Sequence, residues 1–483
     1  MHTSPRTPTR RGWVLGLTAL GSFMVALDTL VVSTALSTIR RDLGASLPSL
    51  EWTVNAYNLT FAVLLLTAAA LGDRFGRRRL FALGLAIFSV ASAACALAPG
   101  VGWLIAARAV QGAGAALVMP LGLALLAAAF PPEKRGAAIG LLGGITGLAV
   151  ASGPLIGGAV VEGIDWPWIF WLNVPLGVVA IPLALRMIPE SRGPAARFDA
   201  GGLALVTVGA LGVVWGLVRG NPAGWGSAEV LGALVAGVAL LVAFVAWERR
   251  TRSPMLPLAF FRRPGFSAGN ASVFFLFASL FGAVFLMAQY FQAALGNGPL
   301  DAGLRLLPWT GTVMIVSPVA GMLADRFGER PFLLGGLLLQ AAGMGWLALV
   351  AGADTAYGTL IAPLILSGCG VSMAIPAGQN AVVGAVPPEA IGTAAGTISM
   401  LRELGGVFGV AVMVAVFAGS GGYASPAQFA DGFAPAVGVS AGLALAGALV
   451  ALTMRGRQPA PGFAPAGLSS GEPQPQPLPA SSA

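Results

Sequence analysis

Residues 71–80 read LGDRFGRRRL and place one aspartate and four arginines in ten positions. Only 10% of the 483-residue chain is charged, and long apolar runs flank this stretch on both sides. A charged side chain is costly inside a hydrocarbon core, so a short polar segment between two such runs predicts a hairpin between two membrane-spanning helices. The stretch therefore indicates a fold class as well as a local turn.

The composition of the whole chain agrees with that class. Hydrophobic residues make up 56% of it and the mean hydropathy is +0.83, outside the usual range of soluble domains. Apolar runs of about 20 residues, the length that crosses a hydrocarbon core of ~30 Å, recur from residue 12 to residue 454. We predict an all-α integral membrane protein with fourteen transmembrane helices. The predicted spans are 12–36, 50–71, 80–98, 101–128, 137–161, 168–188, 200–218, 229–247, 267–293, 305–324, 331–351, 359–384, 393–418 and 434–454.

The basic residues predict the orientation. Most of the 27 lysines and arginines lie in the N-terminal tail and the even-numbered loops, and the odd-numbered loops hold only Arg40, Arg41, Arg219 and Arg305. By the positive-inside rule both termini are cytoplasmic. A pI of 10.6 suggests nucleic acid binding in a soluble protein, but topology explains basic residues spread over inner loops. We expect a lipid bilayer around the chain and no nucleic acid partner.

Several kinds of chemistry are excluded by what the chain lacks. Lys134, the only lysine, is followed by arginine and cannot complete a phosphate-binding loop for ATP. The single histidine is His2, and the two cysteines, Cys95 and Cys369, lie inside apolar runs where small core residues are common. We therefore expect no metal, no cofactor and no enzymatic activity.

The chain contains an internal repeat. GAGAALVMP at 112–120 matches GCGVSMAIP at 368–376, and the hairpin at 71–80 is similar to LADRFGERPF at 323–332. Two parallel halves with a binding site near the membrane midplane are an arrangement that transporters use. The predicted parts are a cytoplasmic tail 1–11, a six-helix half 12–188, two inserted helices with a linker 189–266, a second six-helix half 267–455, and a disordered cytoplasmic tail 456–483.

The motifs together resemble the major facilitator superfamily, in particular its fourteen-span drug:proton antiporter group, over residues 12–455. The supporting stretches are LDTLVVSTAL (27–36), GDRFGRRR (72–79), RAVQGAGAA (108–116), GPLIGG (153–158) and WPWIFWLNVPLG (166–177). The chain departs from the group at Ser33, where asparagine is usual, at Pro167, where arginine is frequent, and at Glu403, where glutamine is common.

The hairpin is expected to act as a conformational latch. Its glycines permit a tight turn, and an aspartate beside arginines can form ion pairs or cap a helix. The resemblance implies that the motif ties the cytoplasmic ends of the halves together in the outward-open state. Positive-inside charge alone is the alternative, but it does not explain the aspartate or the repeated glycines. The residues assigned to the latch are Gly72, Asp73, Arg74, Gly76, Arg77, Asp325 and Arg326.

Four charges are predicted inside the hydrocarbon core: Asp28, Arg108, Arg402 and Glu403. Each costs at least ~2.5 kcal/mol on insertion scales and is a functional candidate. Asp28 and Arg108 lie at similar depths in their spans, so they can pair, either as a proton-coupling site or as a static ion pair. The repeat offset places Leu364 opposite Arg108, so internal symmetry does not require this arginine. Glu403 is a second proton-coupling candidate, or else a local structural partner of Arg402.

Two further sets of residues complete the prediction. Gly153, Pro154, Gly157 and Gly158 allow a helix to bend and to press against a neighbour, and the resemblance implies that this motif marks exporters. The expected substrate cavity includes the polar and aromatic residues Trp52, Tyr57, Gln111, Tyr290 and Arg402.

These features predict a proton-coupled exporter of amphipathic small molecules, cationic or neutral, such as drugs, antibiotics or secondary metabolites. We expect it to be a monomer in the cytoplasmic membrane of a bacterium, since abundant alanine, glycine, proline and arginine with one lysine suggest a GC-rich genome. The alternatives are proton-coupled or facilitated uptake of a nutrient, against which the motif at Gly153–Pro154 argues, and a non-transporting membrane receptor. A receptor would not need Asp28 and Arg108 at matched depth.

Overall fold

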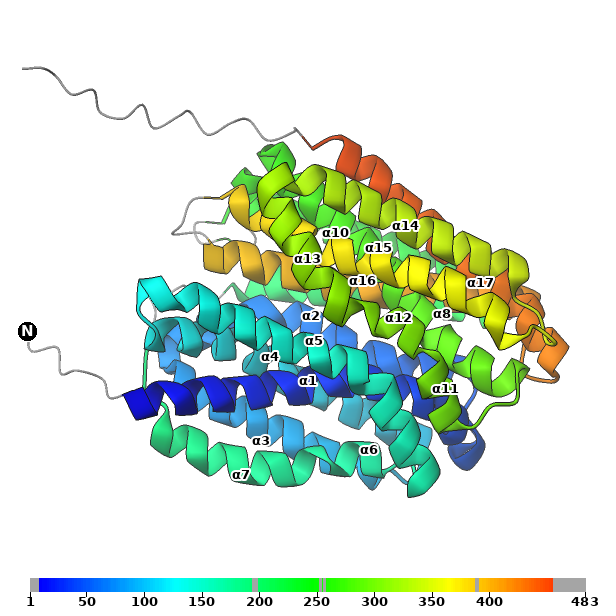
Figure 1. Cartoon of the computed structure of the whole chain (residues 1–483), viewed down its shortest axis with the longest axis horizontal. Helices are drawn as coiled ribbons and strands as arrows, with labels where there is room; N and C mark the ends of the chain where they lie inside the picture. Colours follow the sequence, from blue (N-terminus) through cyan, green and yellow to red (C-terminus); the bar gives the residue numbers. More distant parts are fainter. Residues whose placement is uncertain (1–7, 193–198, 252–253, 255–257, 387–390, 455–483) are drawn as a thin grey trace, which may run out of the picture.

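The computed structural model describes residues 8–192, 199–251, 254, 258–386 and 391–454, which form helices with short connections and no strand. A helix satisfies its backbone hydrogen bonds within one segment, which is why long apolar runs fold as helices in a membrane. Figure 1 shows the long helices lying side by side in one bundle.

The helices fall into three groups along the chain. We call α1–α7 the N-terminal half; its helices are α1 (Pro8–Leu43), α2 (Leu47–Phe75), α3 (Arg77–Ala96), α4 (Val101–Ala129), α5 (Pro132–Gly163), α6 (Trp168–Trp171) and α7 (Asn173–Met187). The inserted hairpin consists of α8 (Ala200–Ala223) and α9 (Ala228–Glu248), and the short η1 (Leu258–Arg262) follows it. We call α10–α17 the C-terminal half; its helices are α10 (Pro264–Gln289), η2 (Tyr290–Ala294), α11 (Pro299–Arg305), α12 (Leu307–Thr310), α13 (Thr312–Phe327), α14 (Glu329–Val350), α15 (Tyr357–Gly384), α16 (Ile391–Ser420) and α17 (Pro426–Leu452).

The prediction of an all-α membrane protein is confirmed. Thirteen of the described helices are long and apolar enough to cross a membrane, and there are fourteen when the two parts of α2, which meet at a bend of 51°, count as one span. Two of these spans consist of more than one helix, α6 and α7 in 168–188, and the end of α11 with α12 and α13 in 305–324, and each still counts as one candidate membrane span. Leu306 and Gly311 lie at the breaks of the second, and Pro308, which lacks a backbone donor, is the second residue of α12.

Two of the predicted spans are shorter than the helices that contain them. α1 continues to Leu43 although its apolar run ends near residue 36, and α17 begins at Pro426 rather than at 434. Hydropathy falls where polar residues begin, but the helix itself continues. Arg40 and Arg41 occupy the last turn of α1, where cations stabilise the negative end of the helix dipole.

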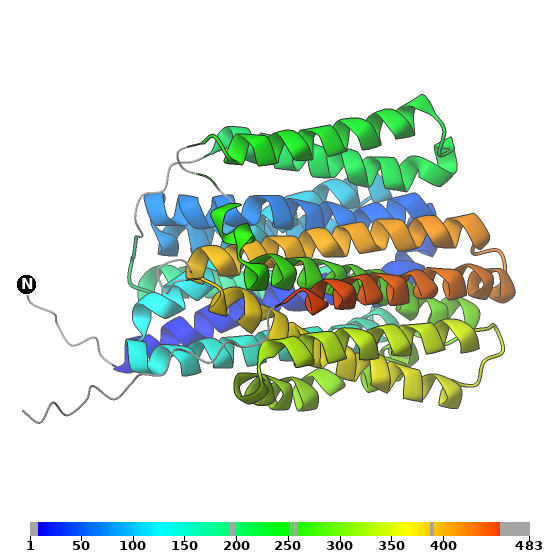
Figure 2. The same ribbon diagram turned by 90° about the horizontal axis from the view of Figure 1, so that it is seen from above.

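The inserted hairpin lies at the side of the bundle (Figure 2). Its first helix, α8, packs against α2 of the N-terminal half and α16 of the C-terminal half. Val214 of α8 belongs to one buried cluster with Leu59 and Val63 of α2 and Val407 of α16. The hairpin therefore contacts both halves at once.

The glycine-rich stretch of α4 explains how its neighbours approach it. A Cβ atom at Gly112 would lie 2.3 Å from the carbonyl oxygen of Tyr57 on α2, and one at Gly114 would lie 2.6 Å from the backbone nitrogen of Phe88 on α3. Larger residues at these positions would push α2 and α3 away from α4. Close packing on both sides fixes the position of Arg108, one turn before Gly112.

We call the end of the bundle that carries the α1–α2 and α10–α11 connections the outer end, following the predicted orientation, and the opposite end the inner end. At the outer end the two halves are in contact. Gln292 of η2 donates from Nε2 to the carbonyl oxygen of Thr34 on α1 at 2.9 Å, and the backbone N–H of Leu300 donates to Glu162 of α5 at 2.9 Å. These hydrogen bonds close the outer side between the halves.

Candidate functional site

The centre of the N-terminal half holds a buried ion pair. Asp28 of α1 accepts a hydrogen bond from Arg108 of α4, and the two side chains are 0% and 1% exposed. The pairing expected from their similar depths is therefore present.

Arg108 is held from several sides. Its Nε donates to the carbonyl oxygen of Thr53 at 3.1 Å and its Nη1 donates to Gln111 at 2.7 Å. The guanidinium carbon lies 4.1 Å from the centroid of the Tyr57 ring, where the face of the ring attracts a cation. The structure thus brings Tyr57 and Gln111, two of the expected cavity residues, to the ion pair.

Amide side chains extend the pair into a network. Gln111 donates from Nε2 to Asp28 and to Ser92 of α3, both at 2.8 Å. Asn173, the first residue of α7, donates to Asp28 at 3.2 Å and to Ser92 at 3.0 Å. Asp28 therefore receives hydrogen bonds from three different side chains, and the network joins α1, α3, α4 and α7. We call these five residues, Asp28, Ser92, Arg108, Gln111 and Asn173, the N-terminal network.

Sequence reasoning missed Ser92 and Asn173. Both are neutral polar residues, which are cheaper than charges inside a membrane and less conspicuous in a sequence. A signal was present for Asn173, since it is the one amide in WPWIFWLNVPLG, next to the break between α6 and α7.

The C-terminal half contains a second network on the corresponding helices. Gln340 of α14 donates to Ser279 of α10 at 3.1 Å and accepts from Ser367 of α15, and Ser279 shares a hydrogen bond of 2.7 Å with Ser440 of α17. All four side chains are at most 1% exposed. Ser367 lies 256 residues after Gln111, at the offset of the internal repeat. The residues of this network carry no charge, and Leu364 stands where Arg108 would repeat.

Arg402 and Glu403 of α16 form an ion pair with each other. Arg402 Nη2 lies 2.7 Å from Glu403 Oε1, and the side chains are 22% and 2% exposed. The guanidinium carbon of Arg402 is 5.6 Å from the ring centroid of Phe277 on α10. The geometry agrees with the structural alternative for this pair, yet Glu403 Oε2 is buried without a hydrogen-bond partner among the described residues.

The hairpin at residues 71–80 makes its contacts with helices of the N-terminal half and with Glu190, just after α7. Asp73 accepts from Arg77 at 2.7 Å, one helical turn later. Gly76 has a φ of 113° and packs against Glu190, which also accepts from the backbone N–H of Arg78 at 2.9 Å. Glycine is required at Gly76 because a side chain rarely adopts that backbone conformation. The motif folds as a tight turn in which Asp73 pairs with Arg77, while Arg78 and Arg79 lie 3.6 and 3.7 Å from Glu190, just after α7.

The remaining latch residues take similar local positions. Gly72 packs against Leu121 of α4, and the guanidinium of Arg74 lies 5.3 Å from the Phe75 ring centroid. In the repeat, Arg326 lies 5.3 Å from the ring of its neighbour Phe327, and Gly328 has a φ of 91°. The side chain of Asp325 is outside the part of the chain that the structure describes.

The glycines of GPLIGG bring three helices together. Cβ atoms at Gly153 and Gly157 would lie 2.9 Å from Leu30 Cβ and 2.6 Å from the carbonyl oxygen of Val31, both on α1. One at Gly158 would lie 2.3 Å from the carbonyl oxygen of Pro299 on α11. The motif therefore packs α5 tightly against α1 and allows the C-terminal half to close on α5 at the outer end.

α11 approaches α5 through a glycine of its own. A Cβ at Gly303 would lie 2.5 Å from the carbonyl oxygen of Pro154. In this contact a glycine of each helix packs directly against the backbone of the other.

Two expected cavity residues lie elsewhere. Trp52 packs on Trp215 of α8, with ring centroids 6.1 Å apart, so it faces the inserted hairpin. Tyr290 stacks on Phe433 at 4.1 Å and donates to the carbonyl oxygen of Gly352 at 2.8 Å, within the outer end of the C-terminal half. Neither contacts the N-terminal network. Aromatic residues line cavities but also pack between helices, and residue type alone does not distinguish the two uses.

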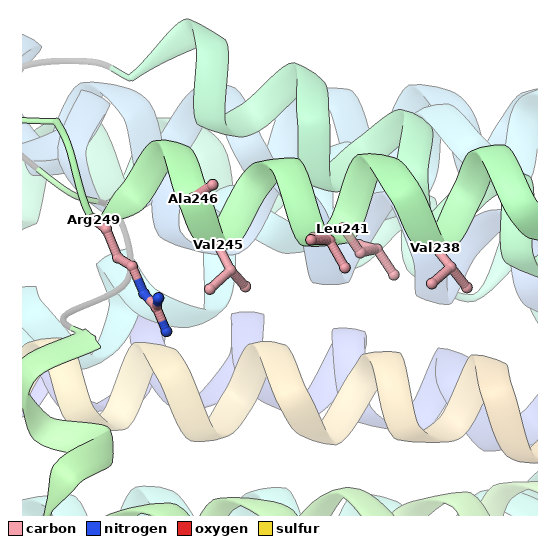
Figure 3. Close-up of a pocket in the computed structure, with 6 residues that line it drawn as sticks. Val238, Leu241, Val245, Ala246 and Arg249 are labelled. Atoms are coloured by element: carbon pink, nitrogen blue, oxygen red, sulfur yellow. The ribbon is translucent and has the colours of Figure 1, made fainter.

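A groove of about 420 Å³ lies along α9 and is not part of this site. Figure 3 shows Val238, Leu241, Val245 and Arg249 on one side of that helix. Its lining is apolar except for Arg249 at the inner end, as suits a surface in contact with lipid. Among the described residues no group of three histidine, cysteine or acidic side chains could hold a metal ion.

Comparison with known families and structures gives concordant matches. The family model described as Major Facilitator Superfamily matches residues 18–291 and 269–480. Two solved structures share the fold: a bacterial homologue of the human lysosomal transporter Spinster in an inward-facing, occupied conformation, and a peptide transporter POT in complex with sulfate. The first has a TM-score of 0.66 at 15% identity, covering 92% of this chain and 97% of that one, and the second has 0.67 at 16%, covering 91% and 93%.

Individual relatives are similar to this chain over most of their length. The tetracenomycin C resistance and export protein of Streptomyces glaucescens is 36% identical over 440 residues, which are 90% of this chain and 82% of that protein. The multidrug resistance protein Stp of Mycobacterium tuberculosis is 36% identical over 405 residues, 83% and 75% of the two chains. The methylenomycin A resistance protein of Streptomyces coelicolor is 36% identical over 397 residues, 82% and 83%.

Proposed function

The chain belongs to the major facilitator superfamily, and from that premise we propose that it exports amphipathic small molecules from the cell in exchange for protons. The names of the relatives, which describe resistance to and export of antibiotics, support the export of such compounds. The observation that carries the proton exchange is the buried carboxylate of Asp28 inside a network that reaches four helices. The direction, the coupling ion and the monomeric state belong to this proposal.

The hydrogen bonds of Asp28 suggest how the exchange works. The contacts from Arg108, Gln111 and Asn173 are all donated to Asp28, which is the pattern that an ionised carboxylate accepts. A proton added to Asp28 would turn one of its oxygens into a donor and would weaken the attraction to Arg108. Because the network joins four helices, protonation would change their packing as well as one local contact. The proton therefore selects between conformations of the N-terminal half.

Alternating access follows from the contacts between the halves. In the present arrangement the outer ends are joined by Gln292, Leu300 and their partners. We propose that substrate enters from the inner side between the halves, near Tyr57, Arg402 and Glu403, and that the outer contacts then separate. The internal ion pair of Asp73 and Arg77 would open in that outward-facing state, so that the latch engages the C-terminal half.

Uptake of a nutrient is the less supported alternative, since the names of the tetracenomycin C and methylenomycin A relatives concern resistance or export. Transport by purified protein in proteoliposomes decides between them. With an imposed pH gradient and a cationic dye as cargo, an exporter in exchange for protons concentrates the dye in the acidic compartment. Accumulation of dye with the proton flux rather than against it would contradict the proposal.

A further inference from the structure

A stripe of three polar side chains on α2 has no part in the site described above. Glu51, Asn55 and Asn58 are spaced four and three residues apart, so they share one face of the helix. Their exposed fractions are 1%, 0% and 1%. Glu51 is four residues from the first residue of α2, about 6 Å along the axis from its outer end.

The neighbours of α2 show where this face points. Thr53 and Tyr57 contact α4 through Arg108 and Gly112, and Trp52 contacts α8. At 100° per residue the stripe lies about 90° from the face of Trp52 and about 150° from the face of Thr53 and Tyr57, so it points toward neither α8 nor α4. α16 of the C-terminal half packs against α2, and Figure 2 shows the two helices side by side. The stripe therefore lies where the halves meet in the outer part of the bundle.

The stripe has more hydrogen-bond acceptors than donors. Asn55 donates from Nδ2 to Glu51 Oε1 at 3.3 Å, while the Oδ1 atoms of Asn55 and Asn58 are buried without a partner. Glu51 has no salt-bridge partner among the described residues. A buried carboxylate with one long hydrogen bond is unfavourable as an anion. A protonated Glu51 would carry no charge and would supply the O–H donor that the neighbouring amide oxygens lack.

The charged groups of the surrounding helices are engaged elsewhere. Arg108 pairs with Asp28, Arg402 pairs with Glu403, and Arg219 of α8 pairs with Glu229 of α9 at 2.9 Å. The titratable and charged groups with described side chains on the helices packed against α2 are Arg11, Asp28, Arg40, Arg41 and Asp42 of α1, Arg77, Arg78, Arg79 and Cys95 of α3, Arg108 of α4, Arg219 of α8, and Arg402 and Glu403 of α16. None of them forms an ion pair with Glu51 within the described part of the chain.

We propose that Glu51 is a second proton-binding site, loaded from the outside, whose protonation allows the outer ends of the two halves to close. This inference rests on the proposed function, because it assumes that the halves separate at the outer end during transport. In the outward-open state water would reach the stripe and Glu51 would be ionised. Closing buries it against α16, and the anion opposes that step. An acidic exterior therefore favours the closed outer end.

The position of Glu51 distinguishes it from Asp28. Its proton is bound when the outer end is open and is released to the same side when that end opens again. Glu51 thus contributes to the pH dependence of closing the outer end without adding to the number of protons carried across the membrane. Asn55 and Asn58 are positioning residues that accept from the protonated acid.

The experiment measures the separation of the outer ends by electron spin resonance in full-length protein in lipid nanodiscs. Spin labels are attached at Pro99→Cys and Asp354→Cys, two exposed positions in outer connections of opposite halves, with Cys369→Ala to remove the half-buried thiol. With Glu51 intact, the ratio of closed to open outer ends should rise by up to about tenfold per pH unit of acidification, as for linkage to one proton. Glu51→Gln should favour the closed form at every pH and should remove this one-proton part of the pH dependence, so that only the part due to protonation of Asp28 remains.

The matched control is Glu229→Gln, which neutralises an exposed outer acid and should keep the pH dependence of the parent. Glu51→Asp should retain a titration, which shows that the effect of Gln is the loss of the proton site and not of folding. An unchanged pH dependence in Glu51→Gln would overturn the proposal. Because this measurement needs neither substrate nor transport, it decides the role of Glu51 even if the parent protein fails to concentrate the dye.

Discussion

Arg40 of α1 stacks on Tyr423 of the α16–α17 connection, with its guanidinium carbon 4.0 Å from the centroid of the ring. Burial raises the pKa of Tyr423, so its hydroxyl keeps its proton and donates to Gln289 of α10. The stacking joins the two halves at the outer end, beside the hydrogen bonds of Gln292 and Leu300.

Removing this contact should favour the open outer end. A cation–π contact contributes about 0.5–2 kcal/mol, so Arg40→Ala should shift the ratio of open to closed outer ends by about 2- to 30-fold. The shift can be measured with the same pair of spin labels. Arg41→Ala is the control, because Arg41 is the exposed neighbour. Equal shifts in both variants would show that net charge matters and the stacking does not.

Gly158 should be indispensable for closing the outer end. Gly158→Ala places a methyl group 2.3 Å from the carbonyl oxygen of Pro299, so α11 must move away from α5. We expect the outer end to stay open and the rate of dye transport to fall at least tenfold. Gly163→Ala, in the last position of the same helix with no atom within 4 Å, should transport normally. Normal transport by Gly158→Ala would mean that this contact does not form during the cycle.

Asp28→Asn tests the principal coupling site. Asparagine keeps the size of the side chain but cannot carry the charge change, so uphill transport driven by a pH gradient should be lost while some downhill exchange remains. Substrate-induced proton release in detergent should disappear as well. Thermal unfolding must be measured alongside, since breaking a buried ion pair can cost about 3–5 kcal/mol.

Glu403→Gln is the control for that experiment. Glu403 already pairs with Arg402, and the resemblance to the antiporter group implies that glutamine is tolerated at this position, so coupling should survive. If Asp28→Asn still concentrates the dye while Glu403→Gln cannot, then Glu403 is the coupling site.

Asp73→Asn should slow transport and leave substrate binding nearly unchanged. The substitution removes the ion pair with Arg77 at 2.7 Å and the contact that we expect with the C-terminal half in the outward-facing state. Both effects act on the conformational equilibrium and not on a binding surface. Transport rates in vesicles and dye binding in detergent separate the two quantities, with Asp354→Asn in an exposed outer connection as control. A full transport rate at normal protein levels would refute the latch.

The orientation can be tested directly by labelling. With Cys369→Ala as background, a cysteine at Ser425, in the outer α16–α17 connection, should react with a membrane-impermeant reagent from outside intact cells. A cysteine at Ser191, after α7, should react only once the membrane is permeabilised. Labelling of Ser191 from outside would reverse the topology.

The sequence predicted the parts of the fold that follow from repeated apolar runs or from charged residues that are unfavourable in a membrane. Apolar runs predicted the helices, and the two buried charges Asp28 and Arg108 predicted their own contact, because each is expensive alone in a membrane. The breaks within 168–188 and 305–324 were missed, since hydropathy averages over a proline or glycine that interrupts a helix.

Other residues were missed because their role depends on a neighbour. Asn173 and Ser92 join the network only because α3 and α7 bring them to Asp28. A neutral polar residue in an apolar run does not by itself indicate such a contact. Glu51 was not counted among the intramembrane charges, because a span that begins at residue 50 leaves it at the edge. Trp52 and Tyr290 were assigned to a cavity on residue type alone, and packing partners account for both.

The uncharged network of Ser279, Gln340, Ser367 and Ser440 has an electrical consequence. With Asp28 ionised, its pair with Arg108 has no net charge, and the pair of Arg402 and Glu403 has none either. A proton on Asp28 would leave Arg108 as the one uncompensated charge of these groups. A full unit charge crossing the membrane is worth about 2.3 kcal/mol per 100 mV. In a cell with a negative interior, the voltage would therefore act mainly on the step that returns the protonated carrier inward, and export of a neutral compound would proceed without electrical work.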